Sequence, residues 1–157
     1  MSAALLTLTG LSVLGLAGSF VVALAGTSSA DISFHVLVAV FSTLLNLLAH
    51  SLMMFYLLGK GGAIKEALAE HKLTGDYMLR VSALRGPVFS RAAYAMALTM
   101  AAAIIGASVD VRVLPKWPHV TLAAGAVLIN LWAVWTEAAV LRATQAIVRE
   151  IDTRILG

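Results

Sequence analysis

The chain has 157 residues, of which 61% are hydrophobic and 12% are charged, and its net charge is +3. A water-soluble domain of this size leaves roughly a third of its chain surface exposed, so it cannot hide this much apolar surface. The absence of cysteine excludes a disulfide framework, a zinc–thiolate site and iron–sulfur ligation. The composition therefore predicts an all-α integral membrane protein, with the lipid bilayer as its main partner.

Four apolar stretches are long enough to cross a bilayer, which takes about 20 residues. We predict transmembrane helices at about 4–26, 33–58, 92–109 and 119–141. Rows of small residues on the first and third helices allow close helix packing. These rows are Gly15, Ser19 and Ala23, and Ala95, Thr99, Ala103 and Ala107.

The four helices form two hairpins in a single membrane domain. The first hairpin covers 1–58 and the second 92–141, and a cytoplasmic connector, 59–91, joins them. A helical extension, 142–157, follows the second hairpin and carries an apolar stripe at Ile147, Ile151 and Ile155. This organisation predicts a four-helix bundle with a short helical segment in the cytoplasm.

The connector has the pattern of two short helices. The first is expected at 63–72, after a glycine-rich turn, and the second at 76–85 with Asp76 as a possible N-cap. Gly86-Pro87 is expected to break the chain before the third transmembrane helix.

The placement of Lys and Arg predicts the orientation in the membrane. Nine of the eleven Lys and Arg residues lie in the connector or the C-terminal extension. The positive-inside rule then puts both termini and the connector in the cytoplasm, and the chain in the inner, cytoplasmic membrane. No basic patch is interleaved with aromatic residues, so we expect no nucleic-acid partner.

A faint internal repeat relates the two hairpins. Residues 35–49 and 119–133 both fit H-V-x-x-A-x-x-x-x-L-x-N-L-x-A, seven identities at an offset of 84. The motif contains the only two asparagines of the chain, Asn46 and Asn130. Both hairpins start from the same side, so we expect a parallel repeat with its axis along the membrane normal.

Each repeat places a narrow polar face on one transmembrane helix. Polar side chains are costly in lipid, so the two faces should turn toward each other. An interhelical hydrogen bond between the two asparagines, worth about 0.6 kcal/mol, would by itself explain why both are present in the membrane. The alternative is that they bind a ligand. The polar faces consist of His35, Ser42, Asn46 and His50 on the second helix, and His119, Asn130 and Glu137 on the fourth.

His35 and His119 are the candidate cofactor ligands. Two imidazoles that face each other across a bundle can bind a b-type haem axially, and the absence of Cys-x-x-Cys-His excludes covalent attachment. A second interpretation is a structural role in the outer head-group layer. A third is a zinc or copper ion held by both histidines with Asp31.

His50 and Glu137 form a second candidate pair. An ionisable side chain inside a membrane predicts a function, and this pair could relay a proton or bind a quinone together with Ser42, Asn46 and Asn130. The structural alternative is that Glu137 reaches the inner boundary or pairs with Arg142.

These patterns predict a membrane subunit of a larger complex that binds haem b for electron transfer. The alternatives are a cofactor-free structural or assembly subunit and, third, a small transporter or proton-conducting unit. No hydrolase motif is present, so an electron-transfer or non-catalytic role is favoured over an autonomous enzyme. Other subunits are expected to bind the connector and the C-terminal helix.

Overall fold

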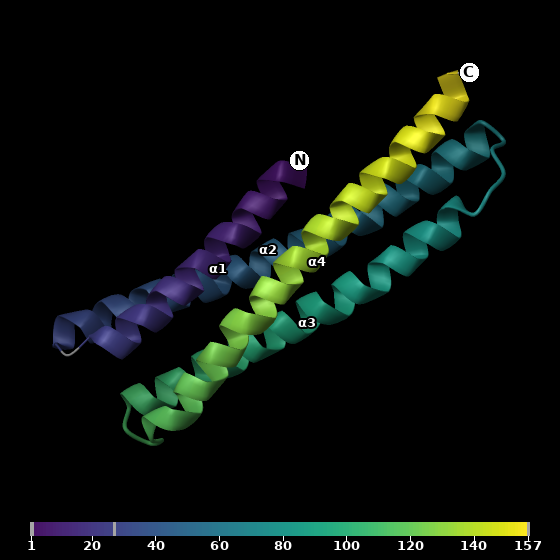
Figure 1. Ribbon diagram of the computed structural model, residues 1–157. Helices are drawn as coiled ribbons and strands as arrows, with labels where there is room; N and C mark the ends of the chain where they lie inside the picture. The colour runs from purple at the N-terminus through teal and green to yellow at the C-terminus, as the bar shows by residue number, and fades with distance from the viewer. Residues whose placement is uncertain (1, 27, 157) are drawn as a thin grey trace.

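The computed structural model describes residues 2–26 and 28–156, which form four long α-helices joined by short turns (Figure 1). All four helices are long and apolar enough to cross a membrane, as the composition predicts. The helices are α1 Ser2–Ala25, α2 Ser29–Glu70, α3 Tyr77–Asp110 and α4 Lys116–Leu156.

The helices pair as two hairpins, α1 with α2 and α3 with α4, that run in the same direction (Figure 1). The α1–α2 and α3–α4 turns lie at one end of the molecule, which we call the hairpin end. The α2–α3 turn and the C-terminus lie at the other, the terminal end. The N-terminus points toward the terminal end but stops short of it, and there Ser2 Oγ accepts a hydrogen bond from Gln145 Nε2 at 2.9 Å.

Three of the four helices are longer than a bilayer is thick. The 24 residues of α1 span about 36 Å, close to the ~30 Å hydrocarbon core. The 42 residues of α2 span about 63 Å, roughly twice that thickness. The ends of α2, α3 and α4 at the terminal end therefore form a three-helix extension without α1.

The connector 59–91 is not a separate segment. Helix α2 continues through its glycines to Glu70, and α3 begins at Tyr77, so the two short helices are the ends of these long ones. The break expected at Gly86-Pro87 is wrong, because Pro87 lies inside α3. Asp76 occupies the N-cap position of α3, but its side chain makes no capping hydrogen bond.

Packing at the terminal end explains why α2 and α3 stay helical there. Buried apolar side chains from α2, α3 and α4 form one cluster, and tertiary packing of this kind outweighs local glycine and proline preferences. The apolar stripe predicted in the C-terminal extension, now the end of α4, is thus covered largely by α2 and α3. The cluster consists of Ile64, Tyr77, Val81, Ile147 and Ile151, with Ile155 packed against it.

A close approach of α1 and α2 sets the packing nearer the hairpin end. A Cβ atom added at Gly15 would overlap the Ser42 hydroxyl, so the two helices touch there without a side chain from α1. Ser42 is 2% exposed. The polar face of α2 is thereby turned into the bundle.

Candidate functional site

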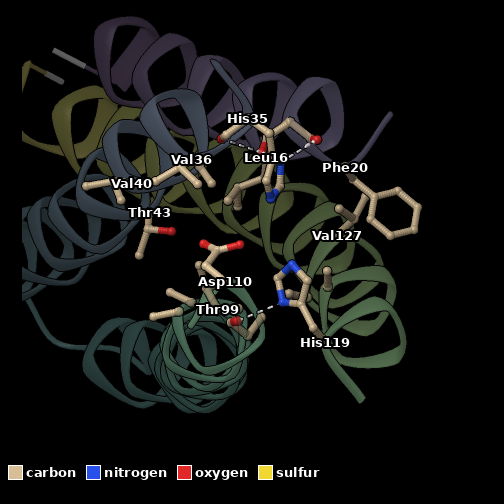
Figure 2. A pocket seen from close by; sticks show the side chains of 18 residues that line it. Leu16, Phe20, His35, Val36, Val40, Thr43, Thr99, Asp110, His119 and Val127 are labelled. Atoms are coloured by element: carbon tan, nitrogen blue, oxygen red, sulfur yellow. Dashed lines mark hydrogen bonds between the residues drawn. The ribbon is translucent and has the colours of Figure 1, made fainter. Parts of the chain in front are cut away.

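His35 of α2 and His119 of α4 face each other across a cavity near the hairpin end. Their ring centroids are 6.1 Å apart and the ring planes meet at 68°. Figure 2 shows both rings entering the same space, each with one nitrogen turned toward the other ring. The fold therefore brings together two histidines that lie 84 residues apart in the sequence.

The Nδ1 atom of each ring is held by a backbone carbonyl of the neighbouring helix. His35 Nδ1 lies 2.9 Å from Ser19 O, and His119 Nδ1 lies 3.0 Å from Ala102 O (Figure 2). A carbonyl oxygen only accepts, so Nδ1 carries the proton in both rings. Nε2 then has a lone pair directed into the cavity, the arrangement that metal-binding histidines usually have.

The cavity between the rings is lined mainly by small and apolar side chains. Its volume is about 120 Å³, and a second cavity of about 400 Å³ continues from it toward the hairpin end. Both are lined by His35, His119 and Asp110. Figure 2 labels Asp110 among the residues that line the cavity.

Gly106 of α3 makes room for the His119 ring. A Cβ atom at this position would lie 2.7 Å from His119 Cε1, closer than real Cβ contacts. The absence of a side chain at Gly106 therefore fixes how deep the imidazole can sit.

Asp31 lines the larger cavity together with both histidines, and its carboxylate also takes part in the N-cap of α2. Its carboxylate accepts hydrogen bonds from Ser28 N at 3.0 Å and Ser28 Oγ at 2.7 Å, in a capping box that starts α2. Within residues 2–26 and 28–156, no group of three or more His, Asp or Glu side chains is arranged to hold a metal ion. The structure thus presents two imidazoles without a third protein ligand.

A buried polar network lies deeper in the bundle and joins both hairpins. Asn46 Nδ2 donates to Asn130 Oδ1 at 2.7 Å, and His50 Nε2 lies 2.9 Å from the same oxygen. His50 Nδ1 lies 2.6 Å from Glu137 Oε1. Three of these side chains are 0% exposed and Glu137 is 1% exposed. We call these four residues the central network.

The amide of Asn130 fixes the protons of the central network. Asn130 Nδ2 donates to Ala126 O at 2.7 Å and to Thr99 Oγ1 at 2.9 Å. Because the Ala126 carbonyl only accepts, Asn130 Oδ1 must be the atom that faces His50. His50 Nε2 therefore carries a proton and donates it to Asn130.

The central network has different neighbours toward the terminal end and toward the hairpin end. Toward the terminal end, a cluster of buried apolar side chains closes the bundle, formed by Met53, Leu57, Val88, Val140 and Leu141. Toward the hairpin end, Thr99 both bonds to Asn130 and lines the histidine cavity. Thr99 thus connects the network to the lining of the cavity.

Arg142 is not the partner of Glu137. Its Nε atom donates to Ala138 O at 3.2 Å on the exposed face of α4. Glu137 instead turns inward to His50 and is 1% exposed.

Sequence reasoning did not assign a site role to Ser19, Thr99, Ser12 or Gly106. Ser19 and Thr99 belong to the rows of small residues, which predict packing. Ser12 accepts a hydrogen bond from Asn46 Nδ2 at 3.3 Å. For Ser19 and Thr99, the one sequence signal of a site role is a hydroxyl within a row of small residues. Gly106 carries no comparable signal.

Comparisons with protein-family models, with curated proteins and with solved structures find no match to this chain.

Proposed function

We propose that the chain is a membrane-embedded subunit that binds a b-type haem between His35 and His119 and carries electrons within a larger complex. The observation that supports this proposal is the facing pair of imidazoles, each tethered at Nδ1 and each with an Nε2 lone pair directed into one cavity. Two groups oriented in this way have the donor atoms for axial ligation.

The separation of the rings suits one metal ion between them. Ligating nitrogens on opposite sides of a metal lie about 4 Å apart, twice a metal–nitrogen bond of roughly 2 Å. The ring centres then lie further out on each side, which a centroid distance of 6.1 Å accommodates. Small movements of α2 and α4 would be enough to adjust the spacing.

The two-histidine donor set suits a porphyrin better than a bare ion. A bare zinc ion prefers four protein ligands, or three with an open position, whereas haem supplies its own four equatorial nitrogens and needs two axial ligands. The small side chains Ala39, Ala103 and Ala123 line the cavity around the rings. Arg112 and Lys116 line the adjoining cavity, where cations would pair with haem propionates.

The proposal places the four helices in the cytoplasmic membrane with both termini in the cytoplasm. Nine of eleven Lys and Arg residues lie toward the terminal end, which supports this orientation. The haem would then lie toward the outer surface. An electron carrier with one redox centre needs a donor and an acceptor, and the exposed Leu79 and Leu156 provide apolar contacts for other subunits at the terminal end.

Absorption spectroscopy tests the haem proposal. Protein expressed with a haem supply is purified, and spectra are recorded in the oxidised and the dithionite-reduced states. We expect a b-type α-band that is lost in His35→Ala and in His119→Ala. His71→Ala, an exposed histidine in the α2–α3 turn, is the matched control and should keep the band.

A colourless wild-type protein with both histidines present would contradict haem binding. The cofactor-free structural subunit would then be the better assignment. The hydrogen bonds from α2 to α4 in the central network favour that second candidate, because they hold the hairpins together without any ligand.

A further inference from the structure

We infer that His50 and Glu137 form a reversible proton-binding site inside the bundle, and that its proton exchanges with the hairpin end. This inference goes beyond the proposed electron transfer and does not depend on a bound haem. It rests on the hydrogen-bond geometry of the pair, on the acceptors around it, and on what separates it from each end of the molecule.

The pair holds one shared proton at rest. His50 Nε2 already donates to Asn130, so the contact of 2.6 Å between His50 Nδ1 and Glu137 Oε1 requires one further proton between the two atoms. Whether this proton is drawn on the imidazole or on the carboxyl, the pair has no net charge. A neutral resting pair explains how two ionisable groups tolerate burial at this depth.

The network has more acceptors than donors. Glu137 Oε2 and Asn46 Oδ1 are buried and accept no hydrogen bond from the described part of the chain. A buried acceptor without a donor is unfavourable, so the network gains from an additional hydrogen. The next proton would add to Glu137 Oε2 as one O–H bond, giving a carboxylic acid beside an imidazolium and a net charge of +1; its release restores the neutral pair.

The hydroxyls that bond to the central network from α1 and α3 are neutral. Ser12 of α1 accepts from Asn46, and Thr99 of α3 accepts from Asn130. The cation on α3 near this depth is Arg91, which donates to Thr136 Oγ1 at 2.7 Å and lies 4.4 Å above the Trp132 ring. Its positive charge opposes uptake of a second proton at neutral pH, so binding is expected on acidification.

The path for the proton leads to the hairpin end. On that side a chain of hydrogen bonds runs from His50 through Asn130 to Thr99, and Thr99 lines the histidine cavity. On the other side the apolar cluster that begins at Met53 and Val140 closes the bundle toward the terminal end. Water penetrates an apolar layer far less readily than a polar one, so exchange should occur from the cavity.

Infrared spectroscopy on sealed proteoliposomes tests the inference. Glu66, Glu70 and Glu150 all lie at the terminal end, so the triple variant E66Q/E70Q/E150Q leaves Glu137 as the only glutamate. This variant is labelled with carboxyl-¹³C glutamate and reconstituted in a known orientation. The pH is then changed on one side of the membrane at a time, and the protonated-carboxyl band is recorded.

We expect the labelled band to increase or to shift in frequency when the compartment at the hairpin end is acidified, and to be unchanged when only the terminal side is acidified. Three results would overturn the inference: a band that never changes between neutral and acid pH, a band that follows the terminal side, or equal responses from both sides. The first result would mean a fixed structural pair.

The absorption spectrum of the same preparation separates this inference from the haem proposal. A colourless sample that shows the one-sided band supports the proton site and contradicts haem. A sample with the b-type spectrum and no change in the infrared band supports haem binding and contradicts the proton site. Glu137→Gln, which should abolish the band, serves only to assign it, so a folding defect in that variant would not affect the conclusion.

Discussion

Asn46 and Asn130, 84 residues apart in the sequence, are joined by a hydrogen bond of 2.7 Å between Nδ2 of the first and Oδ1 of the second. The two asparagines differ in their other contacts. Asn130 also forms hydrogen bonds with His50, Thr99 and the Ala126 carbonyl. Asn46 forms one further hydrogen bond within the described residues, to Ser12.

This difference predicts unequal effects of alanine substitutions. Asn46→Ala should cost about 0.6 kcal/mol, the typical value of one interhelical hydrogen bond. Asn130→Ala should cost about 1–3 kcal/mol, because it leaves the buried His50 N–H without an acceptor. Unfolding by SDS in mixed micelles measures both values. Equal losses would show that Asn130 is not the centre of the network.

Two glycines of α1 test the contact between α1 and α2. Gly15→Ala should destabilise the protein by about 1–3 kcal/mol, because the added methyl group overlaps the Ser42 hydroxyl and forces the helices apart. Gly18→Ala is the matched control, since nothing lies within 4 Å of its Cβ position. It should stabilise α1 by about 0.5–1 kcal/mol through lower backbone entropy in the unfolded state. Thermal unfolding in detergent distinguishes the two outcomes.

Gly106 provides a test of the histidine cavity that leaves both ligands in place. Gly106→Ala should reduce haem content or shift the α-band, because its Cβ atom would displace the His119 ring. Gly86→Ala lies on the same helix in open space and should leave the spectrum unchanged. A spectrum of Gly106→Ala identical to that of the wild type would mean that the ring position does not matter for the cofactor.

The ion pair at the terminal end predicts a pH-dependent stability. The hydrogen bond from Arg80 Nη1 to Glu150 Oε2, at 2.8 Å, lowers the pKa of that carboxyl below its ordinary value. A carboxyl with a lowered folded-state pKa stabilises the protein above the unfolded-state value, about 4.3, and this contribution disappears as the pH falls through the folded-state pKa.

Glu150→Gln should therefore unfold at a slightly lower temperature than the wild type at neutral pH. The difference should shrink toward zero as the pH falls below about 4. Both side chains are 39% exposed, so the effect will be small and will weaken at high salt. A difference that stays constant down to acid pH would show that the pair does not contribute through its charges.

Much of the fold follows from the sequence because lipid-compatible helices have a simple pattern. Four uninterrupted apolar stretches predict four helices, and the scarce polar residues predict which faces turn inward. The helix boundaries within 59–91 could not be predicted from the sequence, because the stability of that region comes from contacts between distant segments. Gly61, for example, accommodates the Arg85 guanidinium from α3, a relation that no local propensity contains.

The candidate site was partly predictable for a similar reason. His35, His119, His50 and Glu137 stand out as ionisable residues in apolar surroundings, and the structure brings them together in two pairs. Which residue pairs with which depends on helix rotation and depth. The carbonyls of Ser19 and Ala102 that orient the two imidazoles were not predictable, because every residue has a carbonyl.

The parallel arrangement of the two hairpins has a consequence for how this architecture could be rebuilt from halves. A homodimer of the first hairpin would contain two copies each of His35, Asn46 and His50, but no acidic group inside the apolar core. A homodimer of the second would contain Glu137 twice, with valine where His50 stands in the first hairpin. Either symmetric assembly retains its histidine pair and its asparagine pair, and only an assembly of the two unequal halves can set one acid against one base.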